Sequence, residues 1–200
     1  LGKDFHILAK RYFLGIDTVV EEAGSSGILA KWLENLKNSF PIRPDARYLP
    51  EYKLRTVSGD MMLEANFDLL LVSKESVQIW DWKTGENNWE DEKKGNSISL
   101  AHSIQTMVYM YVLKEQIQFI TGKNTGEKKI AMHYWQPETA SVVASVEYNT
   151  EMHNNFRKSL SAIIYKIKNY EYDLFDRTQY LKKCRYCEYN WACEKQYLNV

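Results

Sequence analysis

Apolar residues recur along the first fourteen positions at the spacing of a helix that buries one face. The residues that follow the i, i+3, i+4, i+7, i+8 pattern are Phe5, Leu8, Ala9, Tyr12 and Phe13. This pattern predicts a helix over residues 4–14. A second helix is expected over about 26–38, where Pro41 and Pro44 follow and prevent its continuation.

Three strand-like runs come next, and short turns separate them. Residues 48–57 lead into the turn signal Ser58-Gly59-Asp60, and residues 61–72 return from it. After a second turn at 73–76, residues 77–83 form the third run. Because turns this short join antiparallel neighbours, the three strands are predicted to form a meander.

The second half of the chain repeats the mixture of helices and strands. Residues 84–97 are polar and are predicted to form a loop, and 98–120 read as a long helix. Residues 130–135 and 141–148 alternate like strands, and Thr150 is expected to cap a last helix that reaches about residue 170. The order predicts an α/β fold, with a mixed sheet of an antiparallel meander plus further strands, flanked by helices.

The length and composition of the chain are typical of one globular domain. The 200 residues are 44% hydrophobic and 26% charged, which suits a packed core. We expect a single domain, with N-terminal helices over 1–45, a core over 46–170, and a cysteine-bearing tail over 171–200 that packs on the core. The chain begins at Leu1 without Met, so N-terminal residues are expected to be missing.

Net charge and hydropathy limit the classes of partner that the chain is expected to bind. The formal net charge is zero, so any nucleic-acid contact requires local basic patches. The sequence contains no apolar run of the roughly 18 residues that a membrane helix needs, so no membrane partner is expected. The sequence also has no signal peptide, which favours a cytoplasmic location.

Two carboxylates interrupt otherwise apolar strands. Asp68 lies in the run Asn66 to Val72, and burying an ionised Asp is costly unless a cation accompanies it. On the next strand, Asp81 and Lys83 share one face, since side chains alternate along a strand. If the two strands pair, Asp68 lies beside Asp81, with Lys83 within reach.

These three residues suit metal-assisted hydrolysis of phosphodiesters. Carboxylate oxygens bind Mg²⁺, and the ion acidifies a bound water and neutralises charge on the phosphate. A lysine can orient or deprotonate that water, or stabilise the developing negative charge. The alternative interpretation is structural: Asp68 ends a strand, and Asp81 and Lys83 are an exposed ion pair.

The motif formed by Asp68 and the segment Asp81-Trp82-Lys83-Thr84-Gly85 resembles that of the PD-(D/E)xK nucleases, in particular their RecB-like and Cas4-like branch. The resemblance covers about residues 1–170 and implies a restriction-endonuclease-like core. It implies that Asp68 and Asp81 bind Mg²⁺ or Mn²⁺ and that Lys83 assists the attack on the phosphodiester.

Flanking residues extend this resemblance. Gln105 and Tyr109 match the family's Q-x-x-x-Y motif, which contacts DNA, and their i, i+4 spacing places both on one helix face. Gly2 to His6 matches a G-x-x-F-H helix whose His binds the catalytic metal, although a lone His on such a helix can also be structural. Glu51 occupies a position where some relatives carry a Glu near the site, or it is a charge at the rim.

Three cysteines form a C-x2-C-x5-C cluster near the end of the chain: Cys184, Cys187 and Cys193. Thiolates at this spacing bind zinc or an iron–sulfur cluster, both of which normally need four ligands. In the related branch a fourth Cys upstream of the His helix completes a [4Fe–4S] cluster, and its expected position lies before Leu1. The alternative is that the thiols are merely buried.

We therefore expect a metal-dependent DNA nuclease, exonuclease-like on single-stranded ends. The resemblance implies a role in DNA repair, recombination or CRISPR adaptation, with a helicase or an adaptation protein as a possible partner. The first alternative is a catalytically inactive nucleic-acid-binding module with the same fold. The second is a zinc-stabilised interaction domain built on the cysteines. Cleavage polarity, the number of metal ions and the oligomeric state do not follow from the sequence.

Overall fold

The computed structural model describes residues 1–17, 25–59, 61–85, 100–122 and 128–171. The chain divides into two compact units, Leu1–Ile164 and Tyr165–Val200. The first unit contains the sheet and the candidate site. Most of the predicted loop over 84–97 and the whole cysteine cluster lie outside the described residues.

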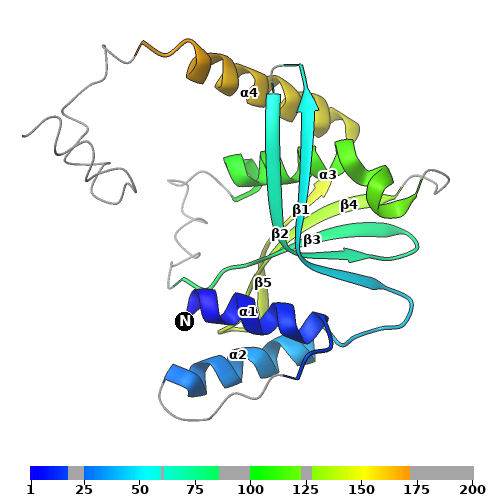
Figure 1. Ribbon diagram of the computed structural model, residues 1–200, viewed down its shortest axis with the longest axis vertical. Coiled ribbons are helices and arrows are strands. Elements are labelled where there is room, and N and C mark those ends of the chain that lie inside the picture. The colour runs from blue at the N-terminus through cyan, green and yellow to red at the C-terminus, as the bar shows by residue number, and fades with distance from the viewer. Residues whose placement is uncertain (18–24, 60, 86–99, 123–127, 172–200) are drawn as a thin grey trace, which may run out of the picture. The chain divides into compact units, whose positions relative to one another are not determined.

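Five strands form one mixed sheet in the first unit, in the order β1-β2-β3-β4-β5 (Figure 1). Their bounds are β1 Arg47–Ser58, β2 Met61–Val72, β3 Ser76–Trp82, β4 Lys129–Gln136 and β5 Ser141–Tyr148. All neighbours are antiparallel except β3 and β4, which are parallel. The predicted meander and the mixed sheet are therefore confirmed, and the parallel pair arises because a helix connects β3 to β4.

The helices also lie close to their predicted positions. Their bounds are α1 Gly2–Phe13, α2 Ser25–Ser39, the 3-10 turn η2 Leu100–His102, α3 Ile104–Thr121 and α4 Thr150–Lys168. Helix α3 begins later than predicted because the Ser103 side chain accepts a hydrogen bond from the Thr106 N–H and so caps the helix there. The predicted cap at Thr150 was wrong by one residue, since the Asn149 side chain accepts from the N–H of Met152.

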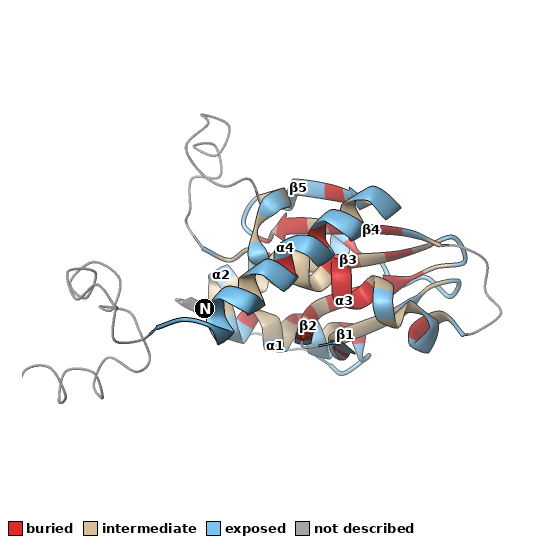
Figure 2. Cartoon of the chain, turned by 90° about the horizontal axis from the view of Figure 1, so that it is seen from above, coloured by how far each residue is buried: buried red, intermediate tan, exposed pale blue. Residues whose placement is uncertain are grey.

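Helices cover both faces of the sheet, and each face has its own apolar core. On one face, α3 and Phe156 of α4 pack against β1 to β4. On the other face, α1 and α2 pack side by side over an aromatic cluster (Figure 1). Most buried residues belong to the strands and to α3 (Figure 2). Among the described helices, none combines the length and the apolar composition that a bilayer span requires.

The β1–β2 hairpin bends midway along its length (Figure 1). Phe67 and Leu70 both belong to the α3-side core, although positions three apart in a regular strand face opposite ways. On the paired strand, Leu49 and Tyr52 are also three positions apart, and both pack against the same core. At this point Glu51 adopts a φ of 50°, a left-handed conformation that is unfavourable for a residue with a side chain. The bend therefore turns both strands at Glu51 and Asp68.

Helix α1 is fixed to the sheet by Phe5, which is fully buried. Its ring lies 5.7 Å from that of Trp32 and 6.4 Å from that of Trp135, distances typical of favourable aromatic pairs. We expect Phe5→Ala to lower the free energy of unfolding by about 3–5 kcal/mol, because it leaves a cavity. Urea denaturation followed by tryptophan fluorescence measures this change.

The control is Ile7→Ala, which truncates a 58% exposed residue of the same helix and should change the stability by less than about 0.5 kcal/mol. Equal losses for the two variants would show that α1 is not held by this aromatic cluster.

Candidate active site

Three carboxylates lie in one row across β1, β2 and β3. Glu51 is opposite Asp68, and Asp81 lies one step beyond the last β2–β3 pair, next to Asp68. The pairs that fix this row are Pro50–Leu69, Tyr52–Phe67 and Leu69–Trp80. Such a row repels itself electrostatically unless cations lie close by. The bend of the hairpin thus gathers negative charge at one place.

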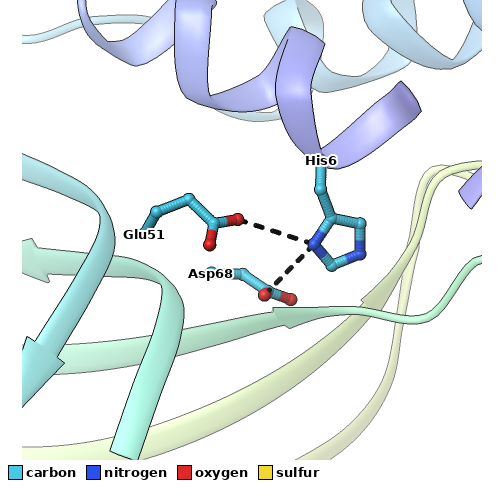
Figure 3. Close-up of side chains that lie close together, drawn as sticks. All are labelled: His6, Glu51 and Asp68. Carbon is cyan, nitrogen blue, oxygen red and sulfur yellow. Dashed lines mark ion pairs between the residues drawn. The ribbon is translucent and has the colours of Figure 1, made fainter. Parts of the chain in front are cut away.

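The imidazole of His6 reaches this row from α1 (Figure 3). Its Nδ1 lies 3.2 Å from Oδ1 of Asp68 and 3.7 Å from Oε1 of Glu51. One ligand atom from each of the three residues lies within 4.8 Å of the others, a group that could hold a metal ion. The other carboxylate oxygens are held by the protein: Trp82 N–H donates to Asp68 Oδ2 at 2.7 Å, and Asn66 Nδ2 donates to Glu51 Oε2 at 3.2 Å.

The carboxylates around His6 raise the pKa of its imidazole. Burial alone would lower this pKa, but the hydrogen bond and charge of Asp68, followed by the charges of Glu51 and Asp81, outweigh burial and raise it. The metal-free site therefore favours a protonated imidazole. Since a ligating imidazole must be neutral, a metal ion has to compete with that proton.

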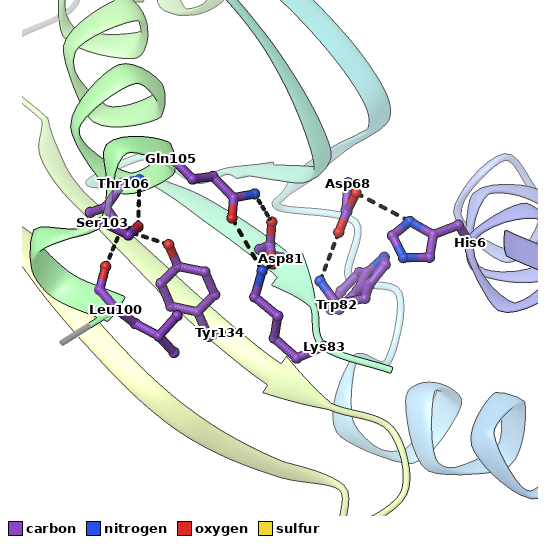
Figure 4. Close-up of polar contacts among 10 residues, drawn as sticks. All are labelled: His6, Asp68, Asp81, Trp82, Lys83, Leu100, Ser103, Gln105, Thr106 and Tyr134. Atoms are coloured by element: carbon purple, nitrogen blue, oxygen red, sulfur yellow. Dashed lines mark hydrogen bonds and ion pairs between the residues drawn. The ribbon is translucent and has the colours of Figure 1, made fainter. Parts of the chain in front are cut away.

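Asp81 is held by a different set of contacts, on the α3 side of the row (Figure 4). Its Oδ2 lies 2.6 Å from Nζ of Lys83, and its Oδ1 accepts from Nε2 of Gln105 at 2.6 Å. Lys83 Nζ also donates to Oε1 of Gln105 at 3.2 Å. The amide of Gln105 therefore joins the acid and the lysine into a closed triangle.

Asp81 is almost fully buried. Burial raises its pKa, and the negative charge of Asp68 raises it further, while Lys83 and the hydrogen bond from Gln105 oppose the rise. A buried carboxylate that repels its neighbour in this way is stabilised by any added positive charge. The arrangement is therefore poised to accept a cation beside Asp68 and Asp81.

The N-terminal end of α3 is anchored so that Gln105 meets this pair. The hydroxyl of Thr106, which is buried, lies 2.6 Å from that of Tyr134 and donates to the carbonyl of Leu100. Tyr134 is also the β4 partner of Asp81, and Lys83 Nζ lies 4.9 Å from the centre of its ring. The contacts tie α3, β3 and β4 together at the site.

Helix α1 begins close to the residues that follow β3. A Cβ at Gly2 would lie 2.7 Å from the hydroxyl oxygen of Thr84, so a larger residue there would require the Thr84 side chain to move. Thr84 follows Lys83 directly, and His6 stands one helical turn beyond Gly2. Glycine at this position thus allows the helix that carries His6 to lie close to the segment that carries Asp81 and Lys83.

The structure places the sequence-predicted residues in two adjoining groups. His6 and Asp68 come together with Glu51, whereas Asp81 contacts Lys83 and Gln105 instead of joining the group that could hold a metal ion. The proximity of Asp68 and Asp81 was expected from strand pairing. The cysteine ligands Cys184, Cys187 and Cys193 lie outside the described residues.

Tyr109 lies one turn after Gln105 and is half-buried. Its ring packs edge-on against Phe67 at 5.2 Å, and burial raises its pKa, with a hydrogen bond from Gln105 opposing the rise. The resemblance implies that both residues contact DNA beside the site. In the structure Gln105 binds protein groups of the site itself, and Tyr109 packs beside it.

Sequence reasoning missed Asn66, Thr106 and Tyr134. Tyr134 lies beside Asp81 only because β3 and β4 are parallel and in this register, which no local pattern specifies. Asn66 carried a usable signal, because it is a polar residue two positions before Asp68 on the same strand. Its amide oxygen is a buried polar atom without a partner in the described structure.

The donor set suits a divalent cation. Two carboxylates and one imidazole converge at the bend, and carboxylates favour Mg²⁺ and Mn²⁺, while an imidazole is a poorer ligand for Mg²⁺ than for a transition metal. The positive φ of Glu51 is consistent with this function, because strained conformations persist where the surroundings enforce them and often lie at binding sites.

Comparison with family models gives a match over nearly the whole chain. The family model of the PD-(D/E)XK nuclease superfamily matches residues 1–194. A solved structure titled "Crystal structure of SSO0001" is similar to 86% of this chain and 71% of its own, with 18% identity and a TM-score of 0.40. No curated protein matches the chain. The family match spans the three acids, the lysine and α3.

The contribution of Glu51 to metal binding can be isolated with Glu51→Gln, which keeps the side-chain size and the unusual backbone but removes the charge. We expect the affinity for Mn²⁺ to fall at least tenfold in isothermal titration calorimetry, because an anionic ligand is lost. Glu64→Gln is the control, since Glu64 lies on the same hairpin and pairs with Arg55. Unchanged affinity in Glu51→Gln would show that Glu51 is a rim charge.

Proposed function

The chain belongs to the PD-(D/E)XK nuclease superfamily, and we propose that it is a metal-dependent DNA nuclease acting at the row of acids beside Lys83. Members of this superfamily are typically metal-dependent phosphodiesterases. The observation that carries the proposal is the convergence of His6, Glu51 and Asp68 next to the ion pair of Lys83 with the buried Asp81. Groups that can bind a cation therefore lie next to a lysine that can stabilise negative charge on a phosphate.

His6, Glu51 and Asp68 would hold the cation, which we propose to be Mg²⁺ or Mn²⁺. Asp81 adjoins this group, and we propose that its charge also serves the bound ion, either as a ligand or from beside it. When bound, such an ion acidifies a coordinated water and offsets charge on the phosphate. The mixed donors favour Mn²⁺ over Mg²⁺ in affinity.

Lys83 is proposed to act on the reacting phosphate or the attacking water. Its ammonium has three N–H donors, and Asp81 and Gln105 accept two of them. The remaining donor can orient the water or stabilise the charge that develops on the phosphate. Gln105 and Asp81 fix the direction of the ammonium, so that little reorganisation is needed during the reaction.

The finer assignment rests on the resemblance to RecB-like and Cas4-like nucleases. We propose DNA as the substrate, with exonuclease-like cleavage at single-stranded ends, in DNA repair, recombination or CRISPR adaptation. A helicase or an adaptation protein would then supply those ends. Gln105 and Tyr109 are proposed to lie next to the bound DNA.

A catalytically inactive nucleic-acid-binding module with the same fold is the second candidate. It predicts DNA binding without cleavage under any divalent metal. The observation that disfavours it is that His6, Asp68, Asp81 and Lys83 are all present and that their charged groups lie together.

We further propose that the three cysteines hold a [4Fe–4S] cluster together with a fourth ligand. They are Cys184, Cys187 and Cys193, and the proposal rests on their spacing. We expect anaerobically purified full-length protein to contain iron and sulfide and to absorb near 400 nm. A colourless, iron-free protein would contradict it, and stoichiometric zinc would favour the interaction domain.

The catalytic proposal predicts that Lys83→Ala lowers kcat for cleavage of single-stranded DNA with Mn²⁺ by about 10²–10³-fold, because a charge-stabilising donor is lost. Lys37→Ala, which removes an exposed lysine of α2, should leave kcat unchanged. Circular dichroism and Mn²⁺ calorimetry check that the variant is folded and binds metal. Full activity in folded Lys83→Ala would refute the assignment.

A further inference from the structure

A cleft of about 620 Å³ opens beside the metal-binding group, along one face of α1. Its lining consists of Gly2, Lys3, His6, Ile7, Lys10, Glu51 and Thr84. The α1 residues among them at positions 3, 6, 7 and 10 share one helical stripe. His6 and Glu51 belong both to the cleft and to the metal-binding group, so the cleft leads directly to the candidate reaction centre.

The stripe carries two cations. Lys3 and Lys10 are both exposed, and neither pairs with a carboxylate among the described residues. Seven positions of helix separate them by about 10 Å along the axis. Between them lies Ile7, an apolar side chain that is 58% exposed. The cleft therefore offers two positive charges with an apolar contact in the middle.

We propose that this α1 cleft binds the backbone of a single nucleic-acid strand on one side of the phosphodiester that is cleaved. The proposal rests on the nuclease function proposed above and names how its substrate is held. Lysines at this spacing attract successive parts of a phosphate backbone, and Ile7 can contact a sugar or base between them. Because the acids alone repel a polyanion, cations on the approach are needed.

The pattern of side chains in the cleft favours one strand over a duplex. The cleft offers two cations with the exposed Ile7 between them. A single strand leaves its bases open to contact beside the backbone, whereas a duplex holds its bases paired inside. A single strand or a frayed end can therefore use both the charges and the apolar contact.

The same geometry gives the path of the strand. His6 on α1 and Gln105 on α3 lie on opposite sides of the row of acids (Figure 4). A strand held by Lys3 and Lys10 would pass the acids and leave toward α3. The α1 cleft is thus one flank of the scissile phosphate, and the α3 side is the other.

The test compares Lys3→Ala/Lys10→Ala with Lys37→Ala/Lys158→Ala, which also removes two exposed lysines. Both doubles are made in a Lys83→Ala background, and binding of fluorescein-labelled 20-mer oligothymidylate is measured by anisotropy across salt concentrations. Each lost phosphate contact makes the slope of log K against log salt less negative by about 0.7 for a single strand. We expect a change of about 1.4 for the cleft double and none for the control.

Two further measurements make the proposal falsifiable. Lys3→Arg/Lys10→Arg keeps both charges and should keep the slope, and a blunt hairpin duplex should bind more weakly than the single strand. Equal slopes for the cleft and control doubles would overturn the cleft. Equal binding of the duplex, with the same loss in the cleft double, would overturn the single-strand assignment.

Cleavage of bis(4-nitrophenyl) phosphate, which is too small to need the cleft, separates this proposal from the nuclease function. With Lys83 intact, the cleft double should hydrolyse this diester at the rate of the unaltered protein with Mn²⁺. If neither protein hydrolyses it, the nuclease function fails, while a changed salt slope still supports strand binding at α1. If only the cleft double loses this activity, Lys3 and Lys10 act in the reaction centre and the cleft assignment is contradicted.

Discussion

Mutual repulsion among Glu51, Asp68 and Asp81 is the constraint around which the site is built. The acids lie in adjacent register positions on three strands, and Asp81 is almost fully buried. Burial, followed by the charge of Asp68, raises the pKa of Asp81, so the metal-free protein must offset negative charge with its own cations. Lys83 does so for Asp81 on one side, and His6 does so for Asp68 on the other.

The fold supplies two partners of these acids, His6 and Gln105, from elements that are far apart in the chain. Helix α1 brings His6 because Phe5 is buried under it and because Gly2 allows a close approach to Thr84. Helix α3 brings Gln105 through the Thr106–Tyr134 contact. Both helices pack on the sheet through buried side chains, which fixes His6 and Gln105 relative to the acids, and electrostatic catalysis depends on such fixed groups.

Much of this could be predicted from the sequence because it depends on local periodicity. Strand alternation placed Asp81 and Lys83 on one face, and short turns predicted that Asp68 would neighbour Asp81. The part that could not be predicted depends on irregular or long-range geometry. The sequence left Glu51 open between a residue near the site and a charge at the rim, because its place beside His6 and Asp68 depends on the bend of the hairpin at a left-handed residue. Tyr134 lies beside Asp81 only through the parallel register of β3 and β4.

The central claim is that the bend of the hairpin and the histidine of α1 form one metal site. Anomalous diffraction at the manganese edge from crystals soaked in Mn²⁺ tests it directly. The account predicts a peak bonded to Glu51, Asp68 and an imidazole nitrogen of His6, next to Asp81. A peak held by other groups, or no peak at these residues at a concentration that saturates binding in solution, would contradict it.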